Sequence, residues 1–363
     1  MASSPPRLRS LDALRGFDMA WIVGGQKLLA GVAAASGWGW LKWMESQTHH
    51  PQWNGFTFWD LIFPLFLFLA GVSLPLSFAK RRQAGDGTAT LALHALRRGL
   101  TLVALGVLYN GLLAFQFDEL RYASVLGRIG LGWMFAAFIV LRCDVRGQIW
   151  WIVGILVGYW AALVLVPVPG SGAGFLAPGE TLTDWVDRQL LPGRLYHGVR
   201  DPEGILSTVP AVATALAGAL AGHWLARPDV AGGRKAAGLL QAGLGALALG
   251  GVWQLVLPLN KNLWTSSFVA WTAGWSLLAL AAFYWVIDVR GWRAWSFPLV
   301  VVGTNAITIY LLERFVDFAA VTNILVGRAA PGALHPALLP AGTLALEWAL
   351  LLWMYKRRIF LRV

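Results

Sequence analysis

A histidine, an amide and a carboxylate lie within eleven residues of one another in this sequence, at the edge of an apolar run. The stretch reads HPQWNGFTFWD at residues 50–60 and continues as apolar sequence to position 78. An imidazole can act as a base near neutral pH, and a neighbouring aspartate can fix its tautomer, as in hydrolytic triads. Ionisable groups at the edge of a bilayer are costly and are functional candidates for that reason. We therefore expect the chemistry to centre on His50 and Asp60.

The alternative for His50 is an interfacial role in which the ring only hydrogen-bonds a loop carbonyl. Asp60 argues against this role, because an unpaired carboxylate about one turn inside an apolar segment would be expensive, and His50 would relieve that cost. The sequence has no Gly-x-Ser-x-Gly elbow to support a serine hydrolase. Its six histidines show no paired spacing typical of metal ligands, so we expect no metal site.

The composition predicts how these residues are held. Of the 363 residues, 57% are apolar, and the mean hydropathy is +0.60, whereas roughly 45–50% apolar is usual for soluble domains. Apolar runs of about 20 residues recur, and each can cross ~30 Å of hydrocarbon as a helix. The sequence thus predicts an all-α, polytopic integral membrane protein, with one domain over residues 1–363 and about ten transmembrane helices. The expected spans are 11–30, 57–79, 98–116, 123–141, 148–167, 205–226, 236–258, 265–288, 296–317 and 337–356.

The distribution of basic residues predicts the orientation. The net charge is +11, but these residues cluster in alternate loops rather than along one face, so nucleic acid is not an expected partner. One set of loops holds 18 of the 29 Lys and Arg residues, and the positive-inside rule then places both termini in the cytoplasm of a multi-pass inner-membrane protein. The inner residues are Arg7, Arg9, Lys80, Arg81, Arg82, Arg97, Arg98, Arg142, Arg146, Arg227, Arg234, Lys235, Arg290, Arg293, Lys356, Arg357, Arg358 and Arg362.

This orientation puts His50 outside, together with the longest loop, at about residues 168–204. That loop is rich in Gly and Pro at its start and in charged residues later. It is expected either to cap a site or to serve as a solvated connector.

Three charged residues stand three apart near the start of the first span, namely Asp12, Arg15 and Asp18. At this spacing they share one side of a helix, so Arg15 can pair with either acid. They form either a self-neutralised cluster that anchors the helix at the inner interface, or a site where Arg15 binds phosphate through its bidentate guanidinium.

Several motifs, in one order along nearly the whole chain, give it a family resemblance. The sequence resembles the bacterial relatives of the heparan-α-glucosaminide N-acetyltransferase family, multispan enzymes that acetylate amino sugars across a membrane. Its opening motif is also similar to the wider transmembrane acyltransferases. The motifs are RSLDALRGFDM (9–19), HPQWNG (50–55), DLIFP (60–64), RIG (128–130), DPEG (201–204), LWTSSF (263–268) and GTNAITIY (303–310).

The resemblance implies a reaction and a place for it. In that family the histidine of His-x-x-Trp-Asn-Gly is catalytic, which corresponds to His50 and not to His49. The implied enzyme is an N- or O-acetyltransferase that takes acetyl from cytoplasmic acetyl-CoA to an amino sugar or glycan outside. His50 would be the general base or would carry the acetyl group as acetyl-imidazole, and Asp60 would orient it. A homodimer is implied by analogy alone.

The resemblance also assigns residues to the acceptor side. Trp53, Asn54 and Gln26 are expected at the substrate, where the two amides would hydrogen-bond the thioester oxygen or the sugar. Gln26 stands where the animal enzyme carries an asparagine. Asp201 and Glu203 are expected to shape the acceptor pocket, although Asp201 has the alternative role of N-cap of the sixth span.

On the donor side, basic residues are expected to hold the phosphates of CoA. Arg15, Arg97 and Arg98 would do so at the inner face, and Arg128 is assigned to donor binding as well.

Two other functions compete with the enzyme. A permease for amino sugars such as N-acetylglucosamine would also need many spans and a polar interior, embedded in membrane lipid. Transporters often contain inverted repeats with paired broken helices, and no such pairing is evident in the sequence. A structural membrane scaffold would leave the combination of His50 and Asp60 unexplained.

Overall fold

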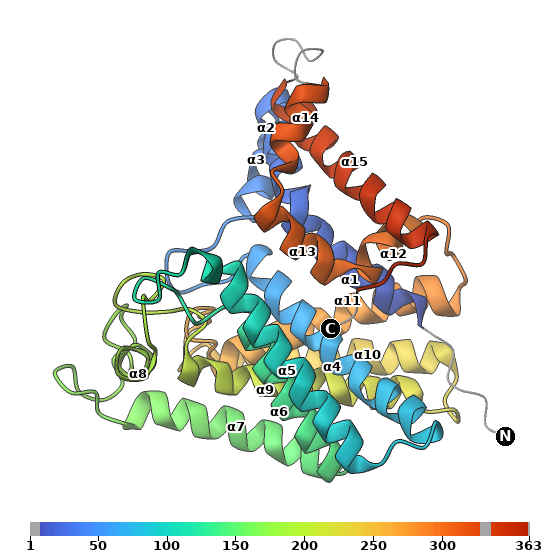
Figure 1. Cartoon of the computed structure of the whole chain (residues 1–363). Coiled ribbons are helices and arrows are strands. Elements are labelled where there is room, and N and C mark those ends of the chain that lie inside the picture. Colours follow the sequence, from blue (N-terminus) through green and yellow to red (C-terminus); the bar gives the residue numbers. More distant parts are fainter. Residues whose placement is uncertain (1–7, 327–334, 362–363) are drawn as a thin grey trace.

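The computed structural model describes residues 8–326 and 335–361, so Arg7 and Arg362 lie outside the described residues. The described chain is a bundle of helices (Figure 1). The helices are α1 (Arg9–Ala20), the π-helical η1 (Trp21–Gly25), α2 (Gln26–Ser36), α3 (Gly39–Ser46), α4 (Trp59–Gln83), α5 (Thr88–Tyr109), the short η2 (Leu112–Ala114), α6 (Val125–Arg142), α7 (Val145–Leu165), α8 (Leu182–Leu190), α9 (Ile205–Ala226), α10 (Gly232–Trp253), α11 (Ser266–Phe283), the π-helical η3 (Tyr284–Val289), α12 (Phe297–Thr304), α13 (Ala306–Phe315), α14 (Phe318–Val326) and α15 (His335–Lys356).

Eight of these helices, counted over the described residues, are long and apolar enough to cross a membrane. They match eight of the ten expected spans, and the all-α polytopic membrane fold is confirmed. The remaining two spans are composite. The first is a continuous run of α1, η1 and α2, and the ninth is divided into α12 and α13 at Asn305. The Asn305 side chain bonds the carbonyl of Ile359 and the N–H of Leu361, so the break is held by the chain's C-terminal segment.

The expected boundary of the third span was wrong by ten residues. Gly87 is the N-cap of α5, which begins at Thr88, so Arg97 and Arg98 lie inside the helix and not in the inner loop. Arg97 is exposed, whereas the Arg98 guanidinium lies 4.2 Å from the ring centroid of Trp133. The polar start of α5 hid its true beginning, because hydropathy detects a helix only where its residues are apolar.

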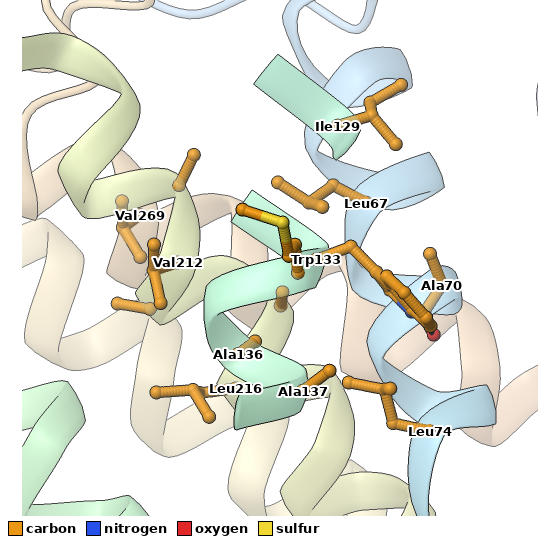
Figure 2. Packing of buried hydrophobic residues seen from close by; sticks show 14 of the residues in the cluster. Leu67, Ala70, Leu74, Ile129, Trp133, Ala136, Ala137, Val212, Leu216 and Val269 are labelled. Carbon is orange, nitrogen blue, oxygen red and sulfur yellow. Dashed lines mark hydrogen bonds between the residues drawn. The ribbon is translucent and has the colours of Figure 1, made fainter. Parts of the chain in front are cut away.

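The centre of the bundle is α4, which packs closely against α9 and α6. Glycines allow this approach, because a Cβ on Gly71 would lie 2.0 Å from the carbonyl oxygen of Ala215, and one on Gly218 equally close to that of Phe68. Small residues at such contacts let membrane helices approach closely. Figure 2 shows the buried side chains where these helices meet, with Trp133 reaching from α6 to the carbonyl of Ala70.

The long loop between α7 and α9, which the charge distribution predicts to be external, is partly ordered by its own short helix, α8. Thr181 and Asp184 form a reciprocal capping box at its N-terminus. In Figure 1, α8 lies at the end of the bundle where α7 stops and α9 starts. The loop therefore covers that end of the helices as a folded segment.

Candidate active site

His50 and Asp60 form a direct hydrogen bond. The loop after α3 carries His50 back over the first turn of α4, and His50 Nδ1 lies 2.6 Å from Asp60 Oδ1. The other Asp60 oxygen accepts the backbone N–H of Thr57 at 3.0 Å and its hydroxyl at 3.3 Å. An ionised carboxylate only accepts hydrogen bonds, so the proton of the neutral imidazole lies on Nδ1 and the lone pair on Nε2.

Burial differs between the two side chains. Asp60 has no exposed side-chain surface, whereas 42% of the His50 side chain is exposed. Asp60 also stands in the first turn of α4, where the helix dipole favours a negative charge. The pair is thus a fixed, buried carboxylate that holds an accessible imidazole.

The adjacent His49 points to a different partner. Its Nε2 lies 2.5 Å from Oε1 of Glu45, one turn back on α3, and 59% of its side chain is exposed. The two histidines therefore bond different carboxylates: His49 bonds Glu45, and His50 bonds Asp60.

A lysine from a distant part of the chain completes the constellation. Lys261 lies in the loop between α10 and α11, and its Nζ is 2.8 Å from His50 Nε2. The ammonium group is a donor only and Nε2 carries the lone pair, so Nζ donates to Nε2. Burial and the nearby charge of Arg128 lower the pKa of Lys261, although Glu203 and Asp60 oppose that shift.

The two loops that carry His50 and Lys261 are pinned to each other. Asn260 Nδ2 donates to Asn54 Oδ1 at 3.0 Å, and the N–H of Gly55 donates to the carbonyl of Leu259 at 2.8 Å. The Asn54 amide oxygen, which was expected to face the substrate, is thus bonded to Asn260 and helps to hold the two loops together. Trp264, which follows in the same loop, is fully buried with φ of 52°, and such strained residues cluster at functional sites.

Gln26 and Trp53 also hold the segment around His50. Gln26 Nε2 donates to the carbonyl of Thr48 at 2.8 Å, which ties α2 to the residues before His50. Trp53 Nε1 donates to the carbonyl of Leu176 at 2.7 Å, and the Arg200 guanidinium covers its ring at 4.7 Å. Both residues thus lie next to the His50 loop, with their polar groups engaged by backbone.

Asp201 and Glu203 belong to a buried ion network with Arg121. Arg121 donates to both oxygens of Asp201, at 2.7 and 2.6 Å, and also bonds Glu203. Burial disfavours the charged guanidinium, but the bonds to Asp201 and the charges of both carboxylates raise the pKa of Arg121 overall. The N-cap of α9 is Gly204, so the expectation that Asp201 caps this span was wrong. The carboxylate of Asp201 instead accepts hydrogen bonds from Arg121 and from the backbone N–H groups of Tyr196 and Glu203.

Of the charged triplet on α1, Arg15 pairs with Asp12 at 3.7 Å. Arg15 also reaches across to α4, where it bonds the Leu69 carbonyl and the Ser73 hydroxyl. Asp18 is fully buried, and neither of its carboxylate oxygens has a hydrogen-bond partner among the described residues.

Arg128 lies in the first turn of α6, at the end of the bundle near the loop that holds α8. It bonds Ser207 and Thr208 of α9 and lies 4.9 Å from the ring centroid of Trp264. A cavity of about 660 Å³ follows α6 from there to its last residue, Arg142. Its walls are mainly apolar, and Glu203 also lines it.

Four arginines among the described residues have a buried guanidinium nitrogen with an unused donor, namely Arg9, Arg98, Arg128 and Arg200, and two of these lie between the long helices. Arg98 Nε and Arg128 Nη1 have no hydrogen-bond partner within the part of the chain that the structure describes. Buried cations with free N–H groups suit an anionic ligand such as a phosphate. The residues present therefore fit a donor that carries phosphates.

Lys261 and Arg121 are the functional candidates that the sequence did not reveal. A lone lysine in an otherwise uncharged outer loop, two residues before the LWTSSF motif, was the available signal for Lys261. Arg121 had a similar signal, as a basic residue in a loop that the charge distribution predicts to be outer, where such residues are few.

Comparisons with known proteins show which families this chain resembles. A family described as a domain of unknown function (DUF5009) matches residues 7–111, which include His50 and Asp60. The heparan-alpha-glucosaminide N-acetyltransferase of Homo sapiens is 29% identical over 86% of this chain and 53% of its own length. The protein of the same name from Mus musculus is 28% identical over 87% of this chain and 55% of its own. The chain thus spans about half the length of the curated relatives that it matches.

Proposed function

We propose that the chain is a transmembrane acetyltransferase, because it is similar over most of its length to the heparan-alpha-glucosaminide N-acetyltransferases of two mammals. The proposed reaction moves an acetyl group from cytoplasmic acetyl-CoA to an amino sugar or glycan on the outer, periplasmic side of the inner membrane. The observation that carries the proposal is the hydrogen bond between the buried Asp60 carboxylate and the accessible His50 ring.

His50 is the proposed general base. Its Nδ1 proton is held by Asp60, so Nε2 carries the lone pair. Once the acceptor amine or hydroxyl displaces Lys261 Nζ from Nε2, this atom takes the acceptor's proton as that group attacks the thioester carbonyl. Asp60 would stabilise the imidazolium that forms, and such base catalysis typically contributes about 10²–10⁴-fold. Attack by Nε2 itself on the thioester, to give an acetyl-imidazole, uses the same tautomer.

The acetyl donor is proposed to enter from the opposite end of the bundle. Arg15 and Arg98 lie between the central helices, and the free donor on Arg98 supports binding of its phosphates. Arg128 lies at the His50 end of the bundle, so its free donor would contact the part of the donor molecule that reaches that end. Arg97, which is exposed on α5, is a further candidate at the surface. The donor supplies the activated carbonyl, and the protein supplies its orientation and the proton transfer.

The acceptor is proposed to bind over the exposed side of His50. Asn54 and Trp53 belong to the loop that carries His50, and Gln26 bonds the residue Thr48 just before it. Asp201 and Glu203, bound to Arg121, are proposed to form the neighbouring wall of the acceptor site. In this proposal Asp201 and Glu203 shape the pocket wall through Arg121, and the amides of Asn54 and Gln26 orient the sugar or the thioester.

The test uses purified protein, acetyl-CoA labelled in the acetyl group, and glucosamine as the first acceptor. The proposal expects label on the sugar, at a rate proportional to the amount of protein. The same preparation in liposomes is tested for uptake of labelled sugar. Saturable uptake without any acetyl transfer would overturn the proposal and favour a permease.

A further inference from the structure

The contact between His50 and Lys261 joins residues 211 positions apart in the sequence, and it places a second proton-transferring group beside the proposed base. Resting on the proposed acetyl transfer, we propose that Lys261 is the general acid of the reaction, which protonates the departing CoA thiolate and is recharged by His50.

The geometry brings Lys261 to the reacting atoms. The acceptor nitrogen must come within hydrogen-bond reach of His50 Nε2, and Lys261 Nζ already lies 2.8 Å from that atom. The thioester sulfur is bonded to the carbonyl carbon under attack, so it lies two bonds from the acceptor nitrogen. The amine of Lys261, once displaced from Nε2 by the acceptor, is therefore next to both the acceptor and the leaving group.

The proposed reaction conserves every proton, and it has four steps. The acceptor nitrogen forms its bond to the carbonyl carbon, and the proton that it loses goes to His50 Nε2. The C–S bond breaks, and the electron pair stays on sulfur. The Lys261 ammonium gives a proton to that thiolate, and the His50 imidazolium then returns a proton to the Lys261 amine. An amine and a thioester thus become an amide and a thiol, with both side chains restored.

The environment of Lys261 suits this role. An ordinary alkylammonium group holds its proton more tightly than a thiol does, roughly 10.4 against 8.5 in pKa, so transfer to a thiolate is uphill. Burial lowers the pKa of Lys261 and reduces that difference. The charged groups that face Lys261 are Asp60 from α4, Glu203 from the segment before α9, and Arg128 from α6. Two carboxylates and one guanidinium thus act on Lys261, and the carboxylates favour its protonated form.

The test varies the leaving group of the donor. Lys261→Met and Lys261→Arg are compared with wild type, using acetyl-CoA and then S-(4-nitrophenyl) thioacetate, whose aryl thiolate is a weak base that needs no proton. With acetyl-CoA, both variants should lose about 10²-fold or more in kcat, because arginine keeps the charge but does not release a proton. With the aryl thioester, the loss should shrink to less than about 10-fold.

The pH dependence gives a second readout. Wild-type kcat should fall on the alkaline side as Lys261 loses its proton, beginning below the range of an ordinary lysine, and Lys261→Arg should lack this fall. Lys42→Met, which removes an exposed lysine of α3, is the matched control and should behave as wild type. Size-exclusion profiles and CoA binding verify that each variant is folded.

The outcomes separate the two proposals. Wild-type activity with acetyl-CoA, together with an equal loss for both donors or full activity in Lys261→Arg, would overturn the role of Lys261 and leave the acetyltransferase intact. An inactive wild type would remove the proposed function and this inference with it.

Discussion

Asp60 shows at the scale of one residue how a carboxylate is kept charged at a membrane boundary. It has no exposed surface, and a buried ionised carboxylate without partners would be too costly to persist. Three hydrogen bonds from His50 and Thr57 and the N-terminus of α4 offset that cost. The bond from His50 also fixes the imidazole, so it both stabilises Asp60 and orients His50.

Asp60→Asn tests this arrangement. The amide oxygen can still accept the N–H of Thr57, but it carries no charge to stabilise an imidazolium and no longer enforces the Nδ1 proton. We expect kcat to fall by about 10²–10⁴-fold, with little change in acetyl-CoA binding. Steady-state kinetics and a donor-binding titration measure the two quantities. Turnover close to wild type would show that Asp60 only stabilises the fold.

The contact between His50 and Asp60 was predictable from the sequence, because these residues lie close together along the chain. His50 and Asp60 are ten positions apart, and their types and their place at the start of an apolar segment were sufficient. Lys261 meets His50 only because the loops around Asn54 and Asn260 bind each other, and no pattern in the sequence reveals that contact.

At the scale of elements, α8 helps to start α9. Asp187 of α8 accepts the backbone N–H of Ile205, the first residue of α9, at 2.8 Å. Gly204 makes room for this contact, because a Cβ there would lie 1.7 Å from Asp187 Oδ2. The side chain of another element thus satisfies a helix N-terminus that has no side-chain cap of its own.

Asp187 predicts a pH dependence of stability. Burial, reinforced by the charge of Asp201, raises the pKa of Asp187 to about 7, although the bond from Ile205 opposes the shift. An unfolded aspartate titrates near ~3.9, so between about pH 4 and 7 the folded state holds a proton that the unfolded state has lost. Stability should therefore fall as pH rises through that window.

Asp187→Asn should lose this contribution, because its amide remains neutral while still accepting the Ile205 N–H. Thermal unfolding in detergent, followed by tryptophan fluorescence from pH 5 to 8, gives Tm for both proteins. The Tm of the variant relative to wild type should increase with pH. Parallel curves would contradict the assigned role of Asp187.

Hydropathy predicted the long elements well and the irregular ones poorly. α4 and α9 are apolar over most of their length, and their predicted positions were nearly correct. The beginning of α5 and the break at Asn305 were missed, because the first depends on a polar helical turn and the second on contacts with the C-terminal segment.

At the scale of the whole molecule, the account depends on the two ends of the bundle facing different compartments. The charge distribution predicts that the loop between α6 and α7 faces the cytoplasm and that the loop containing α8 faces outward. His50, Lys261 and the Arg121 network lie with the latter loop.

Cysteine labelling tests this orientation. In a Cys143→Ser background, Val145→Cys and Ala173→Cys place single thiols at exposed positions on the two sides. A membrane-impermeant maleimide added to intact spheroplasts should label the cysteine at position 173 and reach position 145 only after permeabilisation. The reverse pattern would invert the topology and place His50 in the cytoplasm.

The measurement that tests the central claim most directly compares His50→Ala with His49→Ala in acetyl transfer from labelled acetyl-CoA to glucosamine. The two rings are neighbours in sequence but contact different carboxylates. We predict that His50→Ala abolishes turnover while folding and CoA binding stay nearly intact, and that His49→Ala lowers it only mildly. Turnover retained in His50→Ala but lost in His49→Ala would contradict the account, because it would place the base beside Glu45 instead of Asp60.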